Sequence, residues 1–227
     1  MPNIHNPHLP IVVLISGTGS NLQALIDAIA QESLPVEIRA VISNRPDADG
    51  LARAQRAGIA THTLEHRSYP DRDSFDAALM ASIDGYKPGL VVLAGFMRIL
   101  THGFVEHYSG RLINIHPSLL PEFPGLDTHR RAIAMGKTEH GTSVHFVTPE
   151  VDGGPVIVQA RVPIEPGDTP ERLAARVLAQ EHILYPLVLR WFAEQRLRLQ
   201  GNQVILDGAV LSRPLLLESL HEAHATS

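Results

Sequence analysis

An amide and an imidazole stand two residues apart in the segment Asn114-Ile115-His116-Pro117-Ser118. Leu112 to His116 is predicted to form a strand that Pro117 stops, and side chains two apart on a strand project from the same face. An amide donor beside an imidazole can stabilise an oxygen that becomes negative and can move a proton, as acyl transfer requires. A histidine that ends a strand is more commonly structural, so this pair alone leaves both interpretations open.

Asp152 precedes Gly153 and Gly154 in a loop where glycine lets the backbone bend sharply. Its side chain could cap that turn. Alternatively, the loop could bring the carboxylate close to His116, where an opposite charge would favour the imidazolium form. Spacing along the chain does not decide between these roles.

A glycine-rich turn, Ser16 to Asn21, follows the apolar run Ile11–Ile15 and precedes apolar residues at helical spacing. Such a strand-to-helix turn gathers backbone N–H groups and a helix N-terminus around one point, which suits a phosphate. A dinucleotide signature would need a third glycine where Leu22 stands and an acid after the second strand, where Ser43-Asn44-Arg45 offers none. A monophosphate is the better fit, although a tight turn without a ligand is possible.

Other chemistries find less support in the sequence. There is no cysteine, no G-x-S-x-G elbow, and His140 and His145 lack an H-E-x-x-H context, so neither a thiol nucleophile nor a zinc hydrolase is expected. The net charge of -5 disfavours a nucleic-acid partner. We find no membrane-length apolar run or signal peptide, and expect a cytoplasmic protein with no metal, whether monomer or homodimer.

The elements that must position these residues alternate between strand and helix. This pattern predicts an α/β fold: a single doubly wound, Rossmann-like and mostly parallel sheet with a C-terminal hairpin. Prolines at 117, 121 and 124 predict a long loop before a helix near 128–135. We expect a flexible N-terminal tail at 1–10, one domain at 11–208 and a C-terminal tail at 209–227. The expected strands are 11–15, 38–43, 60–64, 90–94, 112–116, 142–147, 156–162, 197–199 and 204–206.

Four segments together resemble the phosphoribosylglycinamide formyltransferase family over roughly residues 10 to 208. They are Ile15-Ser16-Gly17-Thr18-Gly19-Ser20-Asn21-Leu22-Gln23, Leu93-Ala94-Gly95-Phe96-Met97-Arg98-Ile99-Leu100, Asn114-Ile115-His116-Pro117-Ser118-Leu119-Leu120-Pro121, and Gly141-Thr142-Ser143-Val144-His145-Phe146-Val147 followed by Asp152-Gly153-Gly154-Pro155. The resemblance implies transfer of a formyl group from 10-formyltetrahydrofolate to the amine of phosphoribosylglycinamide, a step of purine synthesis.

The resemblance also implies roles for particular residues. Asn114, His116 and Asp152 would be catalytic, with Asn114 and protonated His116 stabilising the tetrahedral oxyanion. The substrate would be bound through the phosphate turn and the ribose contact, at Gly19, Ser20, Asn21 and Glu181. The folate would be bound by Arg72, Met97, Arg98, Ile99, Leu100, Asn114, Thr148, Pro149, Glu150, Val151 and Asp152. Leu178 and Asp127 depart from the family pattern and are left out of the site.

Three other functions are compatible with parts of this sequence pattern. A hydrolase that releases formate from the same folate would share the catalytic trio, but it usually carries an extra N-terminal regulatory domain, for which the strand starting by Ile11 leaves no room. Transfer to methionyl-tRNA would call for a C-terminal RNA-contacting domain. A non-catalytic nucleotide-binding module could keep the fold, because fold alone does not imply function.

Overall fold

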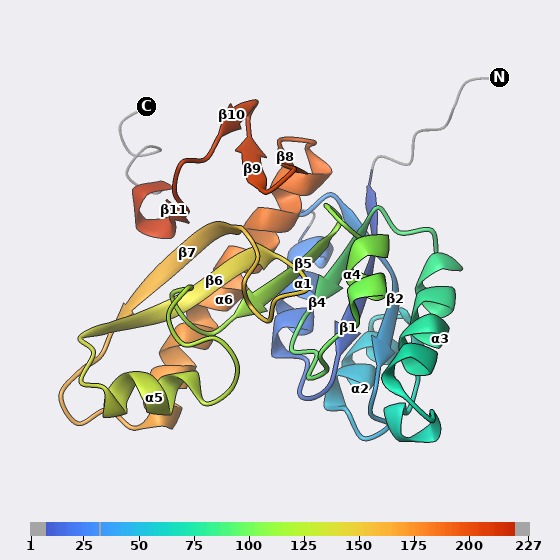
Figure 1. Ribbon diagram of the computed structural model, residues 1–227, viewed down its shortest axis with the longest axis horizontal. Helices are drawn as coiled ribbons and strands as arrows, with labels where there is room; N and C mark the ends of the chain where they lie inside the picture. Colours follow the sequence, from blue (N-terminus) through green and yellow to red (C-terminus); the bar gives the residue numbers. More distant parts are fainter. Residues whose placement is uncertain (1–7, 32, 221–227) are drawn as a thin grey trace.

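The computed structural model describes residues 8–31 and 33–220, and an eight-stranded sheet forms its centre (Figure 1). The strand order is β11-β7-β6-β5-β4-β1-β2-β3. Strands β3, β2, β1, β4 and β5 run parallel, whereas β6 is antiparallel to β5 and β7. The predicted α/β class with a mostly parallel sheet is confirmed. The strands are β1 (Leu9–Ile15), β2 (Val36–Ser43), β3 (Ala60–Thr63), β4 (Leu90–Leu93), β5 (Leu112–His116), β6 (Glu139–Phe146), β7 (Val156–Pro163) and β11 (Leu215–Leu216).

Helices cover both faces of the sheet because the buried strands are apolar on both sides. In β1, Ile11 and Val13 pack on the face that carries α1, α2 and α6, while Val12 and Leu14 pack on the face that carries α3 and α4. In Figure 1, α4 lies in front of the sheet and α6 behind it. The helices are α1 (Ser20–Ala30), α2 (Asp49–Arg56), the short 3-10 helix η1 (His66–Ser68), α3 (Arg72–Asp84), α4 (His102–His107), α5 (Thr128–Ala134) and α6 (Pro170–Ala193).

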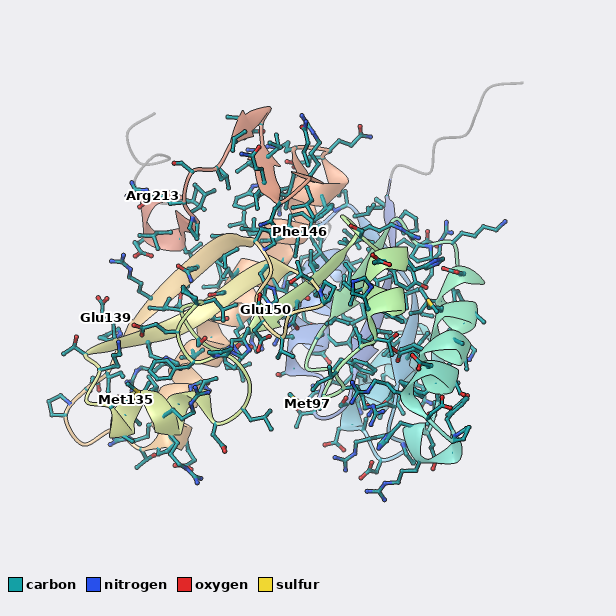
Figure 2. All side chains as sticks on the ribbon, viewed as in Figure 1. Met97, Met135, Glu139, Phe146, Glu150 and Arg213 are labelled. Atoms are coloured by element: carbon teal, nitrogen blue, oxygen red, sulfur yellow. The ribbon has the colours of Figure 1, made fainter. Side chains whose placement is uncertain are left out.

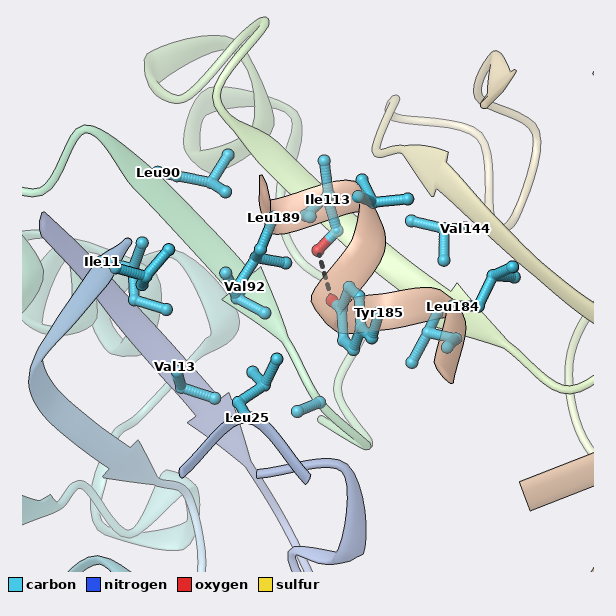
Figure 3. Packing of buried hydrophobic residues seen from close by; sticks show 14 of the residues in the cluster. Ile11, Val13, Leu25, Leu90, Val92, Ile113, Val144, Leu184, Tyr185 and Leu189 are labelled. Atoms are coloured by element: carbon cyan, nitrogen blue, oxygen red, sulfur yellow. Dashed lines mark hydrogen bonds between the residues drawn. The ribbon is translucent and has the colours of Figure 1, made fainter. Parts of the chain in front are cut away.

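The long helix α6 is anchored to the sheet by one buried tyrosine. Thr169 accepts a hydrogen bond from the Arg172 amide and Pro170 occupies the first turn, so the helix starts as its sequence predicts. Tyr185 lies among the apolar side chains of β1, β4 and β5 (Figure 3), and its hydroxyl donates to the Leu93 carbonyl at 2.7 Å. This contact fixes α6 against β4, close to where the parallel strands end.

The chain after α6 is more regular than expected. A three-stranded antiparallel sheet contains the predicted hairpin, β8 (Leu197–Gln200) and β9 (Gln203–Leu206), and adds β10 (Ala209–Val210). The segment 209–220, which we expected as part of a tail, also supplies β11, which pairs with β7. Residues 1–7 and 221–227 of the expected tails lie outside the described residues. No helix in the described part of the chain is long and apolar enough to cross a membrane.

Candidate active site

Strand β5 presents Asn114 and His116 on one face, as predicted. Ile113 and Ile115 belong to the core on the α6 side, so the two polar side chains project toward the α3 and α4 side. Asn114 pairs with Leu93 of β4 on one side and with His145 of β6 on the other. The amide and the imidazole therefore stand where the sheet changes from parallel to antiparallel pairing, at the carboxyl end of β5.

Asp152 reaches His116 from the loop between β6 and β7. Its Oδ2 lies 3.4 Å from His116 Nδ1 and accepts a hydrogen bond from the Gly125 amide at 2.8 Å. On the other side of the ring, His116 Nε2 donates to the Phe123 carbonyl at 2.9 Å. Both ring nitrogens of His116 thus face oxygen acceptors.

Gly154 makes the approach of Asp152 possible. Asp152 itself has a φ of 52°, and Gly154 is packed too closely against the backbone to carry a side chain. A Cβ on Gly154 would lie 1.8 Å from the Phe146 carbonyl oxygen, and a Cβ on Gly153 would lie 2.5 Å from Glu150. Glycine at 154 is therefore required by the backbone of the loop, and the carboxylate of Asp152 faces His116 and the Gly125 amide.

His145 connects Asn114 to this cluster, although we did not predict a role for it. Its Nδ1 donates to the Phe146 carbonyl at 2.8 Å, and burial lowers its pKa, so the ring is neutral and its Nε2 is an acceptor. Asn114 Nδ2 donates to that Nε2 at 3.3 Å, and Asp152 Oδ1 lies 3.8 Å from it. His145 thus sets the orientation of the Asn114 amide.

The loop after Pro117 is fastened to β6 by buried hydroxyl groups. Ser143 Oγ donates to the Ser118 carbonyl at 2.6 Å and accepts from the Leu120 amide at 3.0 Å. Thr142 Oγ1 donates to the His116 carbonyl at 3.0 Å. These bonds hold in place the segment whose carbonyl at Phe123 and amide at 125 contact the catalytic candidates.

The glycine turn is held in shape by the start of α2. Gly19 has a φ of 68°, and a Cβ there would lie 2.6 Å from Gly50 Cα. The Gly50 amide donates to the Gly17 carbonyl at 3.1 Å, and Arg53 Nε donates to the Thr18 carbonyl at 2.8 Å. The turn therefore combines the N-terminus of α1 with a cation, as an anion site needs.

The structure brings Asn21 and Glu181 together although 160 positions separate them. Asn21 Nδ2 donates to Glu181 Oε2 at 2.7 Å, and both side chains are buried. Burial raises the pKa of Glu181, and the hydrogen bond from Asn21 offsets this only in part. Asn21 Oδ1 has no hydrogen-bond partner among the described residues. A buried acceptor without a partner is costly, and a ligand hydroxyl could satisfy it.

A hollow of about 560 Å³ lies between α1, α2 and α6, and neither Asn21 nor Glu181 lines it. It is lined by Ser20 of the glycine turn and by Gln23, Asp27, Arg53, His182 and Ile183. His182 follows Glu181, and its buried Nε2 has no partner in the described structure. We did not predict Arg53 or His182 from the sequence, where nothing links either residue to the glycine turn.

The remaining predicted folate residues fall in three places. Met97 lies at the carboxyl-terminal edge of the parallel strands (Figure 2), in the segment between β4 and α4, where Met97 and Ile99 are 66% and 56% exposed. Arg72 begins α3, one turn before Asp76, which accepts a hydrogen bond from the Thr101 amide. Residues 148–151 form the loop that leads to Asp152, and Val151 is half exposed.

Binding a metal ion requires a cluster of ligating side chains. Across 8–31 and 33–220 no three His, Asp or Glu side chains gather as a metal site would need. The prediction that the reaction needs no metal stays a prediction.

Comparison with known proteins gives a consistent result. The sequence profile of the formyl transferase family matches residues 9–189. Phosphoribosylglycinamide formyltransferase of Escherichia coli (strain K12) is 59% identical over 198 residues, which are 87% of this chain and 93% of that protein. The protein of the same description from Haemophilus influenzae is 47% identical and covers 89% of this chain and 96% of its own length. Among solved structures, phosphoribosylglycinamide formyltransferase from Coxiella burnetii is 60% identical with a TM-score of 0.89, covering 92% of this chain and 99% of that one.

Proposed function

The chain belongs to the formyl transferase family, and we propose that it is the phosphoribosylglycinamide formyltransferase of purine biosynthesis. It transfers a formyl group from 10-formyltetrahydrofolate to the amine of phosphoribosylglycinamide. The observation that carries the assignment of the catalytic centre is the approach of Asp152 to His116 at 3.4 Å, beside Asn114.

The substrate phosphate binds at the glycine turn. The backbone N–H groups of Gly19, Ser20 and Asn21 lie at the N-terminus of α1, where the helix dipole favours an anion. Arg53 holds the turn through Thr18 and adds a positive charge beside the hollow that Ser20 lines. A net charge of -5 makes such local cations necessary for an anionic substrate.

The ribose binds at Glu181. A carboxylate accepts hydrogen bonds from hydroxyl groups, and the free Oδ1 of Asn21 offers a further acceptor next to it. Ribose hydroxyls would thereby pair two acceptors that the protein alone leaves incompletely paired.

The folate binds along Met97 to Leu100. Among the described residues the amides of Arg98, Ile99 and Leu100 donate to no protein acceptor, while Met97 and Ile99 offer exposed apolar surface. Apolar walls with a few free backbone groups suit a flat heterocycle. Arg72 and the loop 148–152 complete this pocket, with Asn114 and Asp152 at the end where the formyl group lies.

Catalysis follows from the hydrogen-bond directions at Asn114 and His116. The neutral substrate amine attacks the formyl carbon, and the carbonyl oxygen becomes an oxyanion. One N–H of Asn114 Nδ2 remains hydrogen-bonded to His145, and the other donates to the oxyanion. His116 Nε2 releases the Phe123 carbonyl and donates to the oxyanion instead. Asp152 balances the imidazolium charge. The attacking nitrogen loses its proton through water to N10, the bond from carbon to N10 breaks, and the formyl amide remains.

A hydrolase that releases formate from the same folate is the nearest competing function, and identity of 59% to a formyltransferase does not favour it. The discriminating assay follows absorbance of the deformylated folate with and without phosphoribosylglycinamide. A signal that needs the amine supports transfer, a signal without it would indicate hydrolysis, and no signal would indicate a binding module. His116→Ala and Asn114→Ala should each lower kcat by about a hundredfold while the protein stays folded, since one oxyanion donor contributes about 3 kcal/mol.

The cellular setting is also part of this proposal. The ligands are two small molecules, and we propose that the enzyme acts in the cytoplasm as a monomer or homodimer. No nucleic-acid partner is included, because the net charge of -5 gives no support for one.

A further inference from the structure

The segment Met97 to Leu100 of the proposed folate pocket lacks regular secondary structure, although it lies between strand β4 and helix α4. Gly95, with a φ of 75°, leads out of β4, and α4 begins at His102. Phe96 and Leu100 are buried anchors on either side of the exposed Met97 and Ile99. Without a strand ladder or helix, the path of this backbone must be set by other contacts.

Ser16 tethers the first end of the segment. Its Oγ accepts from the Met97 amide at 2.7 Å, and its own amide donates to the Gly95 carbonyl at 3.0 Å. The hydroxyl donates its single hydrogen to Asn44 Oδ1 at 2.6 Å, so a lone pair is directed at Met97. Ser16 and Asn44 are buried at the ends of β1 and β2, and the chain of bonds therefore joins three neighbouring strand ends.

Asp76 tethers the second end. This residue of α3 is 1% exposed, and its Oδ2 accepts from the Thr101 amide at 2.6 Å, while its Oδ1 has no partner in the described structure. Next to it in sequence, Phe75 stacks against Arg98, whose guanidinium carbon lies 5.3 Å from the ring centroid. The side-chain hydrogen bond of this buried acid therefore links α3 to Thr101, the residue that follows the segment and caps α4.

We propose that Ser16, Asn44 and Asp76 are positioning residues for the folate: they hold the Met97–Leu100 backbone so that its free amides keep the spacing the cofactor requires. The inference rests on the proposed location of the folate pocket. None of the three side chains needs to touch the cofactor. Their removal should weaken folate binding selectively, because a buried amide that loses its acceptor shifts to find another.

The test measures KM for 10-formyltetrahydrofolate, KM for phosphoribosylglycinamide, kcat and the thermal midpoint of each variant. Ser16→Ala and Asp76→Ala should each raise the folate KM about tenfold, as expected for one lost buried hydrogen bond, and leave the other KM within about twofold. Asp76→Asn keeps an acceptor oxygen for Thr101 and should restore the folate KM. Ser82→Ala and the exposed Asp73→Asn on the same helix are controls and should change neither KM.

Loss of packing alone would lower the thermal midpoint and the active fraction without separating the two KM values. Equal folate KM values in Asp76→Ala, Asp76→Asn and the unaltered enzyme would overturn the inference. The variant Ile99→Glu distinguishes failure of the positioning role from failure of the proposed folate pocket. If Ile99→Glu raises the folate KM and the tether variants do not, positioning is refuted; if Ile99→Glu has no effect, the proposed pocket itself is wrong. Should Ser16→Ala not fold, the Asp76 pair decides alone.

Discussion

Neutralising Glu181 should make the protein more stable and the enzyme weaker. In Glu181→Gln the amide oxygen can still accept from Asn21, because the two side chains have the same shape. Burial raises the pKa of Glu181 in the folded state, so the carboxylate is less favourable there than in the unfolded chain. The stability that this group contributes is complete below the unfolded pKa and is lost as pH rises through the folded one. The glutamine variant has no such loss.

The magnitude follows from burial and from the hydrogen bonds. Each unit by which burial raises the pKa of Glu181 corresponds to about 1.4 kcal/mol at neutral pH, so Glu181→Gln should be measurably more stable than the unaltered protein. A hydrogen bond to a charged acceptor contributes about 1 kcal/mol more than one to a neutral acceptor, so the KM for phosphoribosylglycinamide should rise several-fold to tenfold. The KM for the folate should stay unchanged, since Glu181 lies at the ribose end of the proposed site.

Urea unfolding at pH 4 and pH 7.5, together with steady-state kinetics, provides the measurement. The stability gain should appear at pH 7.5 and vanish at pH 4, where the unfolded carboxyl group is largely protonated. Glu171→Gln is the matched control on the same helix: its pKa is lowered by hydrogen bonds at the exposed N-terminus, so its neutralisation should bring no gain. A Glu181→Gln variant that is destabilised at pH 7.5, or a gain that is the same at both pH values, would refute the reasoning.

Two further predictions concern histidines. His145→Phe removes the acceptor that orients the Asn114 amide and should lower kcat about tenfold with both KM values nearly unchanged; a kcat within twofold of normal would argue against that role. His140 is buried beside His129. Burial, which is the larger cause, and the neighbouring His129 imidazole lower the pKa of His140 to about 4. Unfolding free energy should therefore fall as pH drops from about 6.5 to about 4, because the unfolded chain takes up the proton first. His140→Phe should show a shallower slope in urea unfolding, and equal slopes would contradict the assignment.

Much of the fold follows from the sequence because its strands are buried on both faces. Uninterrupted apolar runs predicted β1 and β4, and β5, predicted to stop before Pro117, has the predicted bounds. Proline at the first turn and a threonine cap predicted the start of α6. The pattern did not predict β10 and β11, which are two-residue strands stabilised by pairing with β9 and β7. Such short strands depend on partners that are distant in sequence.

The candidate site was predictable where a local pattern carries the chemistry. Asn114 and His116 share a face because a strand repeats every two residues, and the glycines after Asp152 mark a sharp turn. The partners of these residues were not predictable. His145 faces Asn114 only through the antiparallel register of β5 and β6, and Ser16 meets Asn44 only because β1 and β2 are neighbours. Register and strand order are tertiary facts, and a single sequence shows neither.

Asp152 approaches His116 although its loop starts at the other end of β5. Because β6 is antiparallel to β5, Phe146 at the end of β6 pairs with Ile113, whereas His116 pairs with Ser143. Since β6 and β7 are antiparallel neighbours, the connection after Phe146 is short and turns back toward β5, where the Val147 amide donates to the Leu112 carbonyl. Gly154 then lets the loop fold tightly enough on the Phe146 carbonyl for Asp152 to reach His116. Replacing Gly154 with alanine should thus move Asp152 away from His116 and leave the phosphate turn unchanged.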